Sequence, residues 1–135
     1  MLWLKQIKLA EKRALQQGEV VSELKTLAKD IVRCEQTIRG LKNNLEAVNA
    51  KYPNPRTTRD DIAYLTDLLE CAKRKLAWEK QMASLQKRTP ATLETMTRLM
   101  NDPQSVPAEE TRAEMLRALQ EIQAAMERLN EVKLG

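Results

Sequence analysis

The sequence predicts an all-α protein, an elongated antiparallel helical bundle or coiled coil of three long helices plus one short helix. The composition is the first reason, because the 135 residues include no Phe, only three Gly and 31% charged residues, as long-helix proteins do. The second is a heptad repeat of apolar residues, and the third is a set of prolines that divides the helical segments. We expect a single domain over residues 1–135.

The first predicted helix, at about residues 2–51, carries the clearest signal. An apolar stripe of shifted phase extends the pattern upstream through Gly18, which costs about 1 kcal/mol relative to Ala inside a helix and leaves continuity there open. Pro53 and Pro55 end the helix near Tyr52. The two core positions of the heptads hold Leu24, Ile31, Ile38, Leu45 and Tyr52, and Leu27, Cys34, Leu41 and Val48.

The second predicted helix, at about residues 59–88, has an unusually broad apolar surface. Asp60 and Asp61 lie in its first turn, where the helix dipole favours negative charge. The surface spans about 220° at 100° per residue, which predicts two neighbours and a central place in a bundle or oligomer. One flank holds Ile62, Leu65, Leu69, Ala72 and Leu76, and the other holds Tyr64, Leu68, Cys71, Trp78, Met82 and Leu85.

Two further helices follow. Thr89 and Pro90 resemble a helix start, which predicts a short helix at about residues 90–101 before Pro103 stops it. The last helix is expected at about residues 107–133. Its predicted seam is Met115, Leu119, Ile122, Met126 and Leu129. Short connections between the long helices predict antiparallel neighbours.

The sequence argues against an enzyme. It contains no histidine, which removes Ser-His and Cys-His pairs and His-ligated metals. Three scattered glycines cannot form a phosphate-binding loop, and two distant cysteines cannot form a structural zinc site. We therefore expect a non-catalytic protein with no metal and no cofactor.

Cysteine usage and hydropathy indicate the compartment. Cys34 and Cys71 lie in apolar helical stripes, where buried reduced thiols are the plain interpretation. No run approaches the roughly 18 apolar residues of a membrane span, and Lys5 and Lys8 interrupt any signal-peptide core. We expect a soluble, cytoplasmic protein.

The N-terminal segment leaves three interpretations open. Trp3, Leu4 and Ile7 share a face, and lysines lie beside it. Such a helix can continue the bundle, enter the groove of a protein partner, or lie on an anionic membrane surface.

The function that fits best is a protein–protein interaction module, such as an adaptor, a scaffold or a chaperone-like subunit. It would bind a partner helix in a groove or self-associate as a homo-oligomer, through apolar stripes that its own chain leaves uncovered. Tryptophan is a favoured interface anchor and methionine tolerates varied partners. The predicted partner-binding residues are Trp3, Leu4, Ile7, Trp78, Met82 and Leu85.

A basic cluster supports the rival interpretation, a bundle that binds nucleic acid or an anionic membrane. Such binding would weaken steeply with salt. The plain alternative is a solvated helix surface, since Glu70 and Glu79 are interleaved. The basic residues are Lys73, Arg74, Lys75, Lys80, Lys87 and Arg88.

Overall fold

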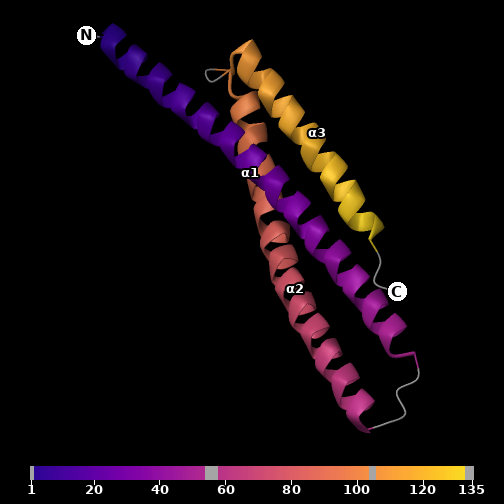
Figure 1. Ribbon diagram of the computed structural model, residues 1–135. Coiled ribbons are helices and arrows are strands. Elements are labelled where there is room, and N and C mark those ends of the chain that lie inside the picture. Colours follow the sequence, from indigo (N-terminus) through magenta and orange to yellow (C-terminus); the bar gives the residue numbers. More distant parts are fainter. Residues whose placement is uncertain (1, 54–57, 104–105, 133–135) are drawn as a thin grey trace.

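The computed structural model describes residues 2–53, 58–103 and 106–132, and its regular elements are three long helices. These are α1 (Leu2–Lys51), α2 (Thr58–Asn101) and α3 (Glu109–Glu131). Successive helices run in opposite directions, so α1 and α3 point the same way (Figure 1). The all-α class and the antiparallel order of successive helices are confirmed.

The central helix is α1, which packs against both α2 and α3. Two ion pairs fix the antiparallel register with α2: Arg88 lies 2.8 Å from Asp30, and Lys51 lies 3.8 Å from Asp67. Two others fix the parallel register with α3, joining Lys25 to Glu114 and Glu35 to Arg128. The expectation that the second helix is central in the bundle is therefore wrong, and a central place for it in an oligomer stays a prediction.

The core is concentrated along the middle of α1, as the heptad predicts. Its most deeply buried large side chains on α1 are Leu24, Leu27, Ile31, Cys34, Ile38 and Leu41. Each has a relative exposure of 2% or less, because side chains of α2 cover one side of α1 and those of α3 the other. The helix is continuous through Gly18, whose position has open space around it.

One buried charge lies within this core. Glu35 is 6% exposed and accepts a hydrogen bond of 2.9 Å from Nε of Arg128 on α3. Arg39, one turn further along α1, lies 3.7 Å from the same carboxylate. Burying a carboxylate is costly unless it is paired, so Arg128 helps hold α3 in register on α1.

The predicted short helix at residues 90–101 does not exist as a separate element, because α2 continues through Pro90 to Asn101. Proline removes one backbone donor, which leaves the carbonyl of Gln86 without its usual partner. Gln86 and Pro90 are both exposed, where water can replace the lost bond. Buried Leu85 and Met96 hold the helix on α1 on either side of the proline.

The last helix begins at Glu109, where residue 107 was expected, and its predicted end at residue 133 lies outside the described residues. Its buried face is also rotated from the predicted seam. Leu119 is only half-buried and Met126 is exposed, while the small side chains of Ala118 and Ala125 face the core. Alanines at these positions allow a close approach to α1. The buried residues are Met115, Ala118, Ile122, Ala125 and Leu129.

Two parts of the molecule extend beyond the three-helix region. Leu99 near the end of α2 shares a groove with Gln16 and Val20, so residues 2–15 of α1 project past α2 (Figure 1). We call this segment the overhang. At the opposite end, Leu129 of α3 lies beside Met82, so residues 58–78 of α2 have α1 as their neighbour but extend past the end of α3 (Figure 1).

Candidate protein-interaction surfaces

The most extended apolar surface lies on α2 where it extends past α3. Ile62, Leu65, Leu69 and Leu76 are each more than half exposed, and Ala72 between them is also exposed. Their spacing alternates between three and four residues, which places all five on one face of the helix. We call these five residues the α2 stripe.

The stripe is exposed because a different face of α2 packs on α1. That face also has alternating spacings of four and three, and it continues unbroken through Pro90. Its positions are Tyr64, Leu68, Cys71, Lys75, Trp78, Met82, Leu85, Thr89, Thr92, Met96 and Leu99. At 100° per residue the α2 stripe lies about 120° around the helix from this seam.

The α2 stripe faces the same side of the molecule as α3. Gln86 and Pro90 lie on that side of α2 and line a groove with Met126 and Leu129 of α3. If α3 were longer at its C-terminal end, its additional turns would therefore lie along the α2 stripe.

Sequence reasoning placed the uncovered surface of this helix on the wrong flank. Leu85 is buried, and Trp78 and Met82 pack against the core, so these three predicted partner-binding residues contact α1 within the chain. Burial raises the pKa of the Cys34 thiol above its ordinary value, and the nearby indole N–H of Trp78 offsets part of that rise. This N–H is buried and has no well-formed hydrogen bond among the described residues.

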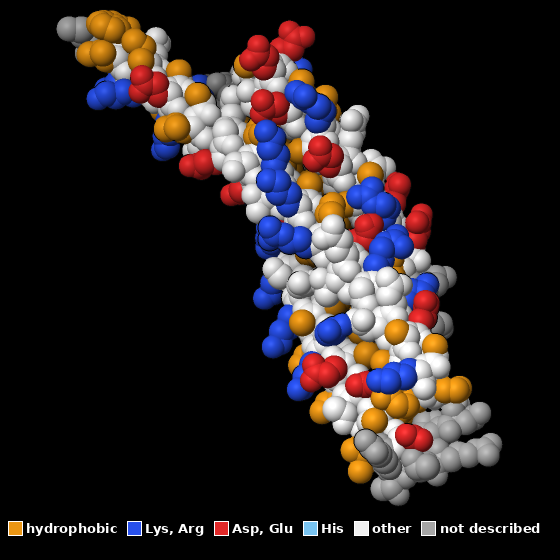
Figure 2. Space-filling model, in the orientation of Figure 1, with side chains coloured by type: hydrophobic (Ala, Val, Ile, Leu, Met, Phe, Trp, Pro, Cys, Tyr) orange, Lys and Arg blue, Asp and Glu red, His pale blue; other side chains and the backbone are white. Residues whose placement is uncertain are grey.

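The overhang carries the second apolar surface. Trp3, Leu4 and Ile7 have relative exposures of 56%, 43% and 46%. These three of the six predicted partner-binding residues therefore lie at an uncovered surface. Figure 2 shows apolar side chains gathered at the tip of this helix. Leu9 is equally exposed but lies on a different face of the overhang.

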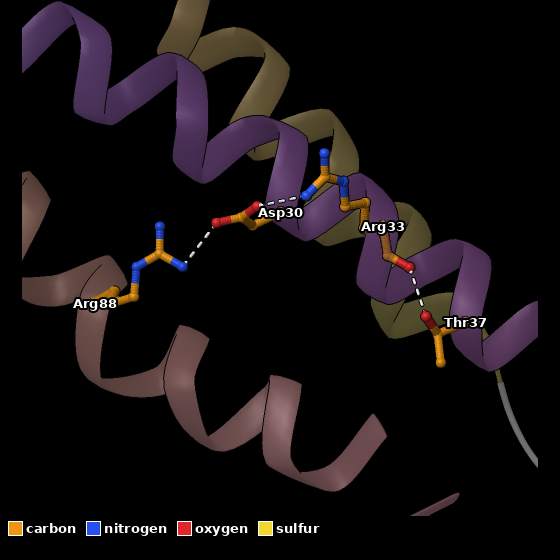
Figure 3. A network of polar contacts seen from close by, with 4 residues as sticks. All are labelled: Asp30, Arg33, Thr37 and Arg88. Carbon is orange, nitrogen blue, oxygen red and sulfur yellow. Dashed lines mark hydrogen bonds and ion pairs between the residues drawn. The ribbon is translucent and has the colours of Figure 1, made fainter. Parts of the chain in front are cut away.

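The predicted basic cluster does not form a single patch. Arg88 turns toward α1, where Nη1 donates a 2.8 Å hydrogen bond to Asp30 (Figure 3). The same carboxylate lies 3.8 Å from Arg33, whose backbone carbonyl accepts a hydrogen bond from Thr37 (Figure 3). Lys73 pairs with Glu70 at 3.3 Å. The exposed members, Lys73, Arg74, Lys75, Lys80 and Lys87, point in several directions around α2.

The described part of the chain holds no group of three or more His, Cys, Asp or Glu residues that could bind a metal ion. Within the same ranges, no helix combines the length and the apolar character that crossing a bilayer requires. Cys34 and Cys71 are both buried free thiols.

Comparison of the chain with protein-family models, with curated proteins and with solved structures finds no match.

Proposed function

We propose that the protein is a non-catalytic protein–protein interaction module that binds an amphipathic helix along the α2 stripe. The observation that carries the proposal is the regular exposure of four large aliphatic side chains, Ile62, Leu65, Leu69 and Leu76, at coiled-coil spacing. Single exposed leucines are ordinary on protein surfaces, but a contiguous apolar stripe marks an interaction site.

The energetics favour a helical partner. Burying a Leu or Ile side chain contributes about 1.5–3 kcal/mol, so four such residues can support a specific contact after the costs of association. An amphipathic helix covers a stripe of this spacing because its own apolar residues recur every three or four positions.

The alternative, binding of nucleic acid or an anionic membrane through the basic cluster, has less support. Arg88 and Lys73 already pair with carboxylates, and the remaining basic side chains do not converge on one surface. The two functions differ in their response to salt. Binding through the α2 stripe should survive moderate salt, whereas phosphate binding should weaken steeply.

Site-specific photocrosslinking in the cells that make this protein tests the proposal. A photoreactive residue at position 69, within the stripe, should form a discrete protein adduct. The matched control is position 77, which is exposed on another face of α2. The position-69 adduct should disappear when Ile62→Asp and Leu65→Asp are introduced. Equal crosslinking from positions 69 and 77, or an adduct that persists in the double variant, would contradict the proposal.

A further inference from the structure

A pocket lies where the three helices meet, apart from the α2 stripe and the overhang. Both α2 and α3 pack on α1, but within the described residues no Cα atom of α2 lies within 8 Å of one of α3. Side chains alone span the space between these two helices, and they leave a pocket of about 200 Å³. We call it the three-helix pocket. Its apolar lining residues are Ile31 of α1, Met82, Leu85 and Pro90 of α2, and Met126 and Leu129 of α3.

The lining of the pocket indicates an uncharged ligand. The remaining lining residues, Gln86, Thr89 and Asn130, are polar but neutral. No lining residue carries a charge, although 31% of the chain is charged. A charged ligand would lose its water without meeting an opposite charge, which is costly. A neutral, largely apolar ligand has no such cost.

The size and the side chains of the pocket favour an aromatic ring. A cavity of about 150 Å³ lined by aliphatic side chains is large enough to hold benzene, so 200 Å³ has room for a slightly larger ring system. Met82 and Met126 lie on opposite walls, one on α2 and the other on α3. Thioether sulfurs make favourable contacts with aromatic rings, and the flexible methionine side chain adapts to their shape.

One backbone acceptor lies at the edge of the pocket. Pro90 has no N–H, so the carbonyl oxygen of Gln86 lacks the hydrogen bond that a helix normally gives it. This oxygen points along the helix toward position 90, and both residues line the pocket. A ligand with an N–H or O–H group at this edge can replace the water that otherwise binds the oxygen.

We propose that the three-helix pocket binds an uncharged aromatic ring that carries one hydrogen-bond donor, as indole does. The ring lies between the two methionines, and the donor bonds to the carbonyl oxygen of Gln86. This site is separate from the α2 stripe, so its tests do not depend on the proposed function.

Nuclear magnetic resonance of the methionine methyl groups is the first test. Indole should shift the Met82 and Met126 resonances saturably, with a dissociation constant on the order of 1 mM for so small a ligand. Met96, Met100 and Met115 do not line the pocket, so their resonances are internal controls that should stay in place. Shifts that never saturate, or equal shifts at all five methyl groups, would overturn the proposal.

A charge placed in the pocket wall tests the site with a matched control. Met126→Glu should weaken indole binding about tenfold or more, read at the Met82 methyl group, because it puts a carboxylate against the ring. Leu116→Glu is the control, since Leu116 is an exposed residue of α3 that does not line the pocket. Circular dichroism checks that both variants stay helical. Equal affinity for indole in the two variants would contradict the assignment.

The role of the Gln86 carbonyl is tested by comparing indole with indene, a ring system of the same shape that has no N–H. Pro90→Ala gives the carbonyl its helical partner, so the ratio of indole affinity to indene affinity should fall about threefold to tenfold. Gly40→Ala also favours the helix but lies outside the pocket, and it should leave the ratio unchanged. A ratio that Pro90→Ala does not change would refute the donor.

The source of the ring is distinguished by a second probe, N-acetyltryptophanamide. If the ring belongs to a tryptophan side chain of another protein, this compound should shift Met82 and Met126 with an affinity similar to that of indole. If the ligand is a free small molecule, the compound should bind about tenfold more weakly or less, because its backbone atoms crowd the rim at Gln86 and Asn130. Binding of neither probe would overturn the proposal.

Discussion

The middle of α1 and the end of α2 that extends past α3 carry the same kind of apolar repeat and have opposite surroundings. Leu27, in the middle of α1, is fully buried, whereas Leu69, at that end of α2, is 56% exposed. Both are leucines in runs spaced three and four residues apart. The difference shows that such spacing indicates a helix face that can bind another helix. The lengths of the neighbouring helices decide whether that other helix comes from the same chain.

The largest expected effect contrasts these two regions directly. Ile31→Ala should lower the free energy of unfolding by about 2–5 kcal/mol, because it leaves a cavity between all three helices. Leu69→Ala should change it by less than about 0.5 kcal/mol, because that side chain is already in water in the isolated chain. Urea denaturation of both variants measures the contrast. Equal losses would show that the stripe is covered within the monomer.

The sequence predicted the central region well because its signal is strictly local. The heptad from Leu24 to Leu41 is buried as expected, and α1 ends next to Pro53 as its proline pattern requires. The predicted helix boundary at Pro90 was wrong, because α2 continues through this residue. Thr89 followed by Pro90 fits the start of a new helix, and it fits equally a proline on the exposed face of a continuous helix. The unbroken spacing from Tyr64 to Leu99 was the signal that could have corrected it.

The candidate site was only partly predictable, for a non-local reason. Both flanks of the second helix are apolar, and only the flank that begins at Tyr64 continues unbroken to Leu99, as the face against α1 does. Whether the other flank is covered depends on where α3 ends, which periodicity in α2 cannot encode. Trp78 appeared to be a surface anchor because tryptophan is common at interfaces, but here it fills the contact with α1 beside Cys34.

Replacing Pro90 tests how α2 spans the three-helix and two-helix regions. Pro90→Ala restores a backbone donor within a continuous helix and should stabilise the protein by about 2 kcal/mol, after allowance for the greater entropy of the unfolded chain. Thermal unfolding followed by circular dichroism measures the gain. A loss of stability would show instead that the proline ring contributes packing in the groove it shares with Met126 and Leu129.

Removing the partner of Glu35 tests what holds α3 beside the middle of α1. Arg128→Ala should cost about 1–2 kcal/mol, because the buried carboxylate then keeps only the longer contact to Arg39. Lys73→Ala, which breaks an exposed pair with Glu70 outside the three-helix region, should cost less than about 0.5 kcal/mol. Chemical denaturation of the two variants at low and high salt separates these contributions. Equal costs would contradict a special role for the buried pair.

The smallest expected effects are at the two helical glycines of α1, which lie near the borders of its buried middle. A methyl group added at either Gly18 or Gly40 meets open space, so alanine should improve helix stability by about 0.5–1 kcal/mol at each position. At Gly40 the whole gain should appear in global unfolding, because packed residues lie on both sides. At Gly18 part of it should appear only as slower amide hydrogen exchange in residues 2–17, because an uncovered helix end can fray while the bundle stays folded. A full gain in global unfolding from Gly18→Ala would show that the overhang unfolds together with the bundle, and that the border between the two regions lies nearer the N-terminus.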